Sequence, residues 1–231
     1  MRKEVCLSPL IRRVLQLFVL VLIQTAALFV SAGTLGWPAG WWYIGLYLLL
    51  LAVGSFVLAP AHKEVIEERS KGAAGGKEWD VWITRLMGIP ALGLLVLSGF
   101  DQRWNWSPPL PLGLRLFGGL TFVAGYALVL WAMCVNQYFS QIVRIQTERG
   151  HTAITDGPYR IVRHPGYLGT TISLLGAVFL LDTLYGLACF ALYLVLIITR
   201  TALEDRTLRA ELPGYAEYVT HTRYRLLPGV W

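Results

Sequence analysis

Charged residues are scarce in this sequence. Only 15% of its 231 residues are Asp, Glu, Lys or Arg, whereas 55% are hydrophobic. This composition excludes an ordinary soluble domain and is typical of a chain that crosses a membrane several times. The net charge of +6 is explained by orientation in the membrane and by anionic lipids, so we expect contact with membrane lipids and no nucleic-acid partner.

Cysteine and histidine are also rare, with three and four copies. No two cysteines form a C-x-x-C pair, so the sequence predicts neither a disulfide framework nor a zinc cluster. No two histidines have the H-x-x-x-H spacing of a helical metal site, and we expect no bound metal. The residues concerned are Cys6, Cys134, Cys189, His62, His151, His164 and His221.

Long apolar runs occupy most of the chain. Four of them are close to the ~20 residues that an α-helix needs to cross a hydrocarbon core. They span residues 10–32, 41–60, 82–100 and 112–135.

Two shorter apolar runs follow, at 167–181 and 184–199. They predict a tight helical hairpin with arms of about 15 residues, short for a full crossing. We therefore expect an all-α fold, a polytopic transmembrane helical bundle of four full spans with a C-terminal helical hairpin and an amphipathic tail. Residues 1–135 would form the four-span region and residues 136–231 the functional core.

Lysine and arginine are concentrated in alternate connections between the runs. The positive-inside rule then places both termini and the segment 136–164 in the cytoplasm. The connection at 61–77 is expected to begin as a helix and to act as a solvated connector. The basic residues of these regions are Arg2, Lys3, Arg12, Arg13, Lys63, Arg69, Lys71, Lys77, Arg144, Arg149, Arg160 and Arg163.

The stretch D-G-P-Y-R-I-V-R-H-P-G-Y-L-G, at 156–169, is polar and lies between two apolar segments. Gly157 and His164 each precede a proline, which favours extended backbone, and the second proline is suited to begin a helix. Arg160, Arg163 and His164 are then expected together at a helix N-terminus, where an anion is favoured. The alternative interpretation is a basic loop that contacts lipid head groups.

The C-terminal region adds a second polar feature. The sequence after residue 199 continues the last helix out of the membrane and places Arg200 and Glu204 four residues apart on one face. Such a pair is commonly a simple ion pair at head-group level. Beyond it, tyrosines and Trp231 alternate with arginines, as in a segment that lies along a membrane interface or covers a pocket.

Together these two regions resemble the isoprenylcysteine carboxyl methyltransferase family and its phospholipid-methyltransferase relatives, over roughly the last ninety residues. One difference is Asp205, where the family usually has a second glutamate. The matching residues are Gly157, Pro158, Tyr159, Arg163, His164, Pro165, Tyr167, Gly169, Arg200, Glu204, Leu208, Tyr215, Tyr218 and Pro228.

The resemblance implies a transferase that uses S-adenosyl-L-methionine and methylates a lipophilic acceptor, such as a prenylcysteine-like carboxylate, a lipid or a small thiol. It assigns His164 and the backbone near Gly166 to the carboxylate of the cofactor, and Glu204 to its ammonium group. Arg163 and Arg200 are the candidates for contact with the acceptor. The remaining cofactor-binding residues that it implies are Tyr159, Tyr167, Leu226 and Leu227.

Two other classes of function stay open on the sequence. Membrane reductases of the sterol-reductase type resemble this core and bind a nicotinamide cofactor at similar basic residues, although their chains are usually much longer. A non-catalytic lipid-binding protein with the same fold is the other alternative.

Overall fold

The computed structural model describes residues 8–231, and within this range the regular structure is entirely helical. Five helices are long and apolar enough to span a membrane: α1 (Pro9–Ala32), α2 (Pro38–Ala61), α4 (Glu78–Trp104), α5 (Leu112–Val135) and α7 (Gly186–Glu211). The protein is therefore a multi-pass membrane protein. The shorter elements are α3 (Lys63–Ser70), α6 (Pro165–Leu180), α8 (Tyr215–His221) and the 3₁₀ turns η1 (Thr147–Arg149) and η2 (Gly157–Arg160).

The first four predicted runs are confirmed as long apolar helices, but the expected hairpin is asymmetric. Its first arm, α6, has 16 residues, whereas α7 has 26 and is a fifth candidate span. At 1.5 Å per residue, α7 is about 39 Å long. The helix continues past residue 199, as the sequence indicated, which makes the second arm long enough to be a candidate span; Arg200 and Asp205 in this continuation have buried ionic partners. The predicted basic residues Arg2 and Lys3, and Cys6, lie outside the described residues.

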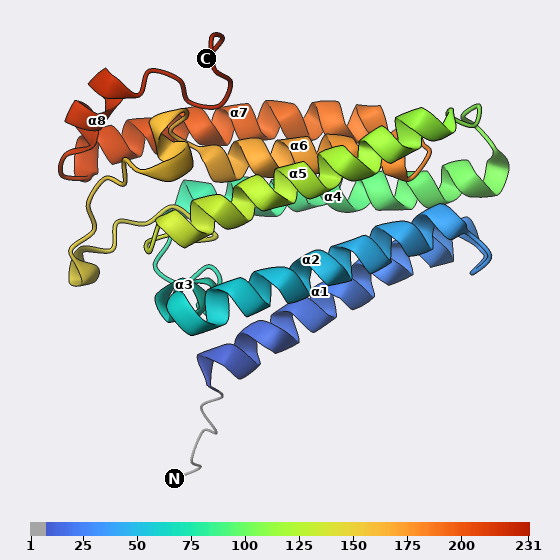
Figure 1. Ribbon diagram of the computed structural model, residues 1–231, viewed down its shortest axis with the longest axis horizontal. Helices are drawn as coiled ribbons and strands as arrows, with labels where there is room; N and C mark the ends of the chain where they lie inside the picture. The colour runs from blue at the N-terminus through green and yellow to red at the C-terminus, as the bar shows by residue number, and fades with distance from the viewer. Residues whose placement is uncertain (1–7) are drawn as a thin grey trace.

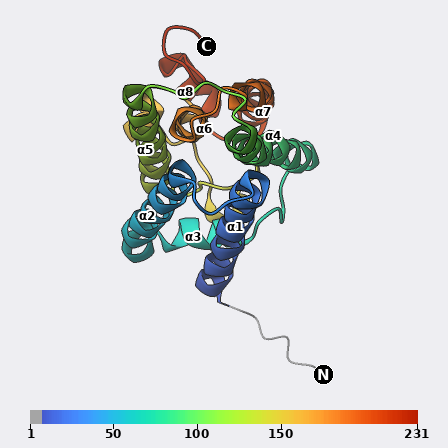
Figure 2. The ribbon, with the colours of Figure 1, turned by 90° about the vertical axis from the view of Figure 1, so that its right-hand side faces the viewer.

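The long helices run in alternating directions along the long axis of the molecule, from one end of the bundle to the other and back (Figure 1). As a result, α3, α8 and the segment 136–164 gather at one end of the bundle, and the connections after α1, α4 and α6 gather at the other. Seen end-on, α1 and α2 lie below the group of α4, α5, α6 and α7 and are spread apart, with α3 between their lower ends (Figure 2). The main packing partner of α1 is α4. The fold thus collects the polar segments at one end, which we call the α3 end.

Glycines allow α5 and α6 to pack in close contact. A Cβ atom on Gly125 would lie 2.4 Å from the carbonyl oxygen of Gly169, and one on Gly176 would lie 2.4 Å from the backbone nitrogen of Phe122. Small residues at such crossings let two helix backbones approach within van der Waals contact. This contact fixes α6, and with it the polar stretch that precedes α6, against the end of α5.

The connection between α2 and α4 does not behave as a solvated connector. It begins as the predicted helix α3, but Val65 is fully buried and Glu68 is 3% exposed. Arg144 donates from Nε to Glu68 Oε1 at 2.5 Å, and Lys71 donates to Glu68 Oε2 at 2.8 Å. A buried carboxylate with two cationic donors anchors α3 to the segment that follows α5.

Candidate functional site

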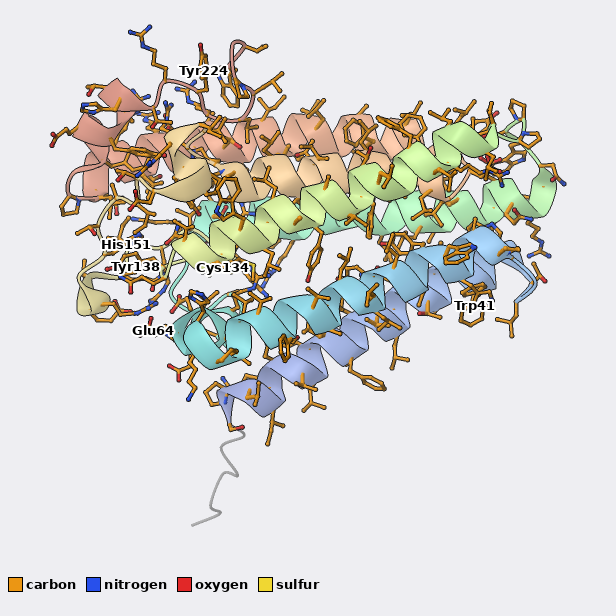
Figure 3. The ribbon with its side chains drawn as sticks, viewed as in Figure 1. Trp41, Glu64, Cys134, Tyr138, His151 and Tyr224 are labelled. Atoms are coloured by element: carbon orange, nitrogen blue, oxygen red, sulfur yellow. The ribbon has the colours of Figure 1, made fainter. Side chains whose placement is uncertain are left out.

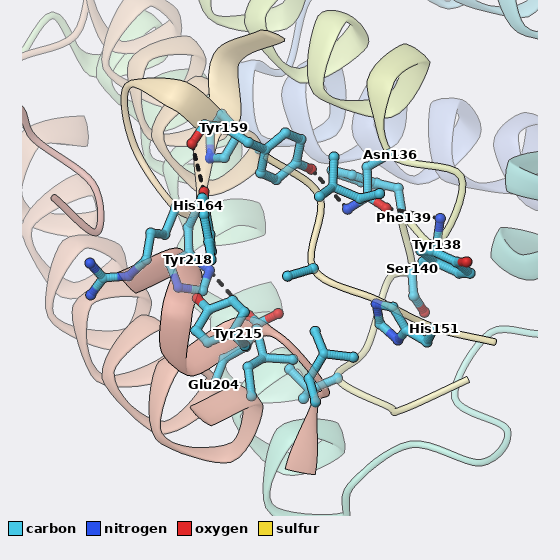
Figure 4. A pocket seen from close by; sticks show the side chains of 18 of the residues that line it. Asn136, Tyr138, Phe139, Ser140, His151, Tyr159, His164, Glu204, Tyr215 and Tyr218 are labelled. Atoms are coloured by element: carbon cyan, nitrogen blue, oxygen red, sulfur yellow. Dashed lines mark hydrogen bonds and ion pairs between the residues drawn. The ribbon is translucent and has the colours of Figure 1, made fainter. Parts of the chain in front are cut away.

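A polar cavity opens at the α3 end of the bundle. It measures about 780 Å³ counted to its open mouth, and we call it the polar cavity. Its walls come from the segment after α5, the N-terminus of α6, the last turns of α7, and α8 (Figure 4). Tyr138 and His151 lie at this end of the molecule, whereas Trp41 lies at the other (Figure 3). The lining includes Asn136, Tyr138, Phe139, His151, Tyr159, His164, Gly166, Tyr167, Glu204, Leu208, Tyr215 and Tyr218.

The turn before α6 places Tyr159 in the wall of the cavity. Gly157 is not extended as predicted but has a φ of +56°, a conformation that glycine adopts without strain. The turn η2 then buries Tyr159, whose hydroxyl accepts a hydrogen bond from Asn136 Nδ2 at 3.1 Å. The carbonyl oxygen of Tyr159 accepts from the Tyr218 hydroxyl at 2.6 Å, which ties α8 to the turn. Burial raises the pKa of the Tyr159 phenol, so it stays neutral at physiological pH.

His164 and Glu204 bring two unpartnered polar atoms to the polar cavity. His164 Nε2 and Glu204 Oε2 are buried and make no hydrogen bond to residues 8–231. The ring nitrogen Nδ1 of His164 lies 3.8 Å from Glu204 Oε2, and Nε2 lies 3.7 Å from Oδ1 of the buried Asp205; both distances exceed that of a hydrogen bond. The His164 ring stacks parallel to that of Tyr167, with centroids 5.6 Å apart. Because buried polar groups normally have partners, such atoms in a cavity wall are typical of a ligand site.

The N-terminus of α6 lies beside this pair. Pro165 begins the helix, as predicted, and the backbone N–H of the next residue, Gly166, makes no hydrogen bond within residues 8–231. A Cβ atom on Gly166 would lie 2.8 Å from the ring of Phe139, so glycine is needed for the close approach of that ring. Free N–H groups and the helix dipole favour an anion at this position.

Arg163 forms a buried ion pair with the carboxylate of Asp205. Its guanidinium donates from Nε to Asp205 Oδ1 at 2.7 Å and from Nη2 to Asp205 Oδ2 at 3.1 Å. Nη1 donates to the carbonyl oxygens of Thr222 and Arg223, each at 2.7 Å. All three nitrogens are therefore occupied, and the side chain is 2% exposed. This geometry differs from the expectation that Arg163 contacts an acceptor, because the bidentate face is already used.

Asp205 is the centre of a larger charge cluster. Besides Arg163, it accepts hydrogen bonds from Arg225 Nε at 3.0 Å and from the Tyr215 hydroxyl at 3.1 Å. Arg209 Nη2 lies 3.0 Å from Oδ2. The Asp205 carboxylate, 1% exposed, thus links α7 to the turn before α6, to α8 and to the tail. The residue at the position of the second family glutamate holds the walls of the polar cavity together.

Arg200 is held in the same manner by a residue that the sequence did not single out. It donates from Nε to Asp80 Oδ1 at 2.7 Å and from Nη2 to Oδ2 at 2.9 Å. The backbone N–H of Val143 also donates to Asp80, at 2.6 Å. The predicted ion pair between Arg200 and Glu204 does not form; instead, the guanidinium lies 4.8 Å from the centroid of the Tyr167 ring. Asp80 is completely buried and joins α4 to α7.

The predicted site residues fall into two groups. The polar cavity is lined by Tyr159, Arg163, His164, Gly166, Tyr167 and Glu204. Outside its lining are Arg200, the buried Leu226, and Leu227, which is half exposed. Arg160 also points away, paired on the surface with Asp156.

Sequence reasoning missed the wall formed by the segment after α5. The rings of Tyr138 and His151 lie against each other at an angle of 32°, with centroids 4.3 Å apart, and the backbone N–H of Gln146 donates to His151 Nδ1 at 3.3 Å. Burial and the nearby charges of Arg149 and Arg144 lower the pKa of His151 to about 4, so the His151 ring is uncharged at neutral pH. The segment has little regular structure and no motif, which left no signal in the sequence.

Comparison with known proteins identifies what this core is similar to. Residues 118–210 match the model of the isoprenylcysteine carboxyl methyltransferase (ICMT) family. The chain is also 31% identical, over 149 residues, to the cobalt-zinc-cadmium resistance protein CzcN of Cupriavidus metallidurans. That alignment covers 62% of this chain and 59% of the relative. The family match includes α6, most of α7 and the turn between α5 and α6, which together form much of the cavity wall.

Proposed function

We propose that this membrane protein is a methyltransferase that binds S-adenosyl-L-methionine in the polar cavity, because residues 118–210 match the model of the ICMT family. The observation that carries the proposal is the pair of unpartnered buried atoms, His164 Nε2 and Glu204 Oε2. Both residues lie in the family-matched segment and line the cavity, His164 from the position just before α6 and Glu204 from α7.

The donor set of the cavity fits this cofactor. Its methionine end carries an ammonium and a carboxylate. Glu204 offers an unpaired anionic oxygen to the ammonium, and His164 together with the free N–H of Gly166 offers donors to the carboxylate. The rings of Tyr159 and Tyr167 form aromatic parts of the cavity wall. We do not assign the adenine to Leu226 and Leu227, which lie outside the cavity lining; the side chains around Tyr138 and His151 offer that surface instead.

The cofactor supplies an activated methyl group on a sulfonium. The residues of this chain then need to orient the acceptor and exclude water. Proximity and orientation of the reactants can lower the activation barrier by up to ~7–11 kcal/mol. We assign Arg163 and Arg200 to positioning: through Asp205 and Asp80 they fix the helices from which Glu204 and Tyr167 reach the cavity. The acceptor that we propose is lipophilic, because the cavity adjoins the ends of membrane helices.

Cofactor binding to the detergent-purified protein tests the proposal. We expect calorimetry to detect binding of S-adenosyl-L-methionine and no binding of a reduced nicotinamide cofactor. In a separate assay, we expect the radiolabelled methyl group to be transferred to extracted lipids or prenylcysteine analogues rather than to water-soluble thiols. Binding of the nicotinamide alone would favour the reductase. If neither cofactor binds, the protein is not an enzyme of either class.

The orientation in the membrane forms part of the proposal, since the cofactor is made in the cytoplasm. The connections at the α3 end (Figure 1) carry the basic residues and line the polar cavity, so this end should be cytoplasmic. In a cysteine-free background, Ala74→Cys and Thr152→Cys should be protected from a membrane-impermeant thiol reagent in intact cells. Thr34→Cys, at the opposite end, should be labelled. Labelling of position 152 from outside would place the cavity on the wrong side.

A further inference from the structure

A second cavity lies between α1, α2, α3 and α5, apart from the polar cavity. It measures about 1120 Å³ counted to its open side, and we call it the lateral cavity. Apart from residues of α5 and Gln141, its lining comes from residues before 118, outside the family match. Its apolar wall consists of Leu10, Val14, Leu17, Leu20, Leu51, Leu58, Val65, Ile66, Val129, Leu130 and Met133.

Two arginines line the lateral cavity at the α3 end. Arg13 comes from the second turn of α1 and Arg69 from the end of α3. Neither has an acidic side chain within 4.0 Å among residues 8–231, and Arg13 makes only a long hydrogen bond, from Nη1 to Gln16 at 3.3 Å. Burial and the charge of Arg13 lower the pKa of Arg69 to about 10. Both guanidiniums remain charged at pH 7, and they repel each other.

Every other buried arginine described above is matched by a carboxylate: Arg163 by Asp205, Arg200 by Asp80 and Arg144 by Glu68. Two partly buried cations with no such partner leave a local excess of positive charge beside an apolar wall. An anionic group between them would relieve the repulsion and accept bidentate hydrogen bonds. An aliphatic chain attached to that group would lie along the leucines of α1 and α2.

We propose that the lateral cavity binds a phospholipid with an anionic head group, whose phosphate lies between Arg13 and Arg69 and whose acyl chain lies between α1, α2 and α5. Tyr47 and Tyr126 line the same cavity as further hydroxyl donors. The lateral cavity is separated from the polar cavity by Phe139, which lines the polar cavity and whose ring centroid lies 5.6 Å from the Arg69 guanidinium. The proposal does not depend on which cofactor the polar cavity holds.

Native mass spectrometry of the purified protein, with phosphatidylglycerol or phosphatidylcholine added and no cofactor present, tests this site. The wild type should retain phosphatidylglycerol at least tenfold better than phosphatidylcholine. Arg13→Gln combined with Arg69→Gln should abolish this preference. Arg12→Gln is the control, since it removes one positive charge from the adjacent, exposed position of α1 and should leave the preference intact.

A variant that keeps the positive charge distinguishes loss of the lipid preference from loss of folding. Arg69→Lys should retain most of the preference, with a melting temperature close to that of the wild type. The proposal would be overturned if the wild type retained both lipids equally. It would also be overturned if Arg12→Gln lost the preference for phosphatidylglycerol as fully as the double variant does, because the basic surface as a whole would then attract the lipid. Because lipid retention is read without cofactor, failure of the proposed methyltransferase function would leave this result unchanged.

Discussion

Asp205→Asn should destabilise the protein by about 3–5 kcal/mol, the range for removing one partner of a buried ion pair. The carboxylate is 1% exposed and neutralises the equally buried Arg163, together with Arg225 and Arg209. Asparagine keeps the size of the side chain but leaves these guanidiniums without a counter-charge. Unfolding by SDS in mixed micelles, followed by tryptophan fluorescence, would measure the change in free energy.

The control for this variant is Asp156→Asn. Asp156 pairs with Arg160 at 2.7 Å, but both side chains are more than 70% exposed. Exposed ion pairs contribute about 0–1 kcal/mol, so this variant should unfold almost as the wild type does. If Asp205→Asn were equally mild, the cluster around Asp205 would not be what holds α7, α8 and the tail together.

Glu204→Gln should weaken the binding of S-adenosyl-L-methionine by tenfold or more, equivalent to at least ~1.4 kcal/mol. The substitution keeps the size and helix propensity of the side chain and removes the negative charge that we propose for the ammonium group. Because Glu204 Oε2 has no partner among the described residues, the variant breaks no hydrogen bond of the structure. Calorimetry with the purified variant would measure the affinity.

Glu211→Gln provides the matched control on the same helix. Glu211 pairs with Lys77 on the surface at 2.7 Å and does not line the polar cavity. Its variant should bind the cofactor as the wild type does. Unchanged affinity in Glu204→Gln would remove Glu204 from the cofactor site and would leave the cavity without its proposed anionic ligand.

The helices could be predicted because their signal is local. Runs of about 20 apolar residues predict membrane-spanning helices wherever they occur, and α1, α2, α4 and α5 match the four predicted runs closely. At α7 the sequence indicated a helix that continues past residue 199 but an apolar run short for a full crossing, whereas the helix is long and apolar enough to be a candidate span. The charges beyond that point are paired across the fold, and such pairing cannot be read from neighbouring residues.

The candidate site could be predicted only in part, for a related reason. Short motifs identified His164, Gly166 and Glu204, all of which line the polar cavity. The same motifs assigned Arg163 and Arg200 to the acceptor, since an arginine in a motif looks the same whether its partner is a ligand or a carboxylate. Asp80, on α4, lies 120 residues before Arg200, and no pattern connects the two.

What the sequence by itself determined is a polytopic helical membrane protein with a family-specific pair of polar regions, because apolar runs and turn-forming prolines act over a few residues. Only the tertiary structure decided which charges face a ligand and which hold the helices together. The close contact of α5 with α6 aligns the turn before α6 with the end of α7, and there Asp205 satisfies Arg163 while Glu204, one residue earlier, keeps an unpaired oxygen. Adjacent positions on a helix point in different directions, so this division depends on three-dimensional packing.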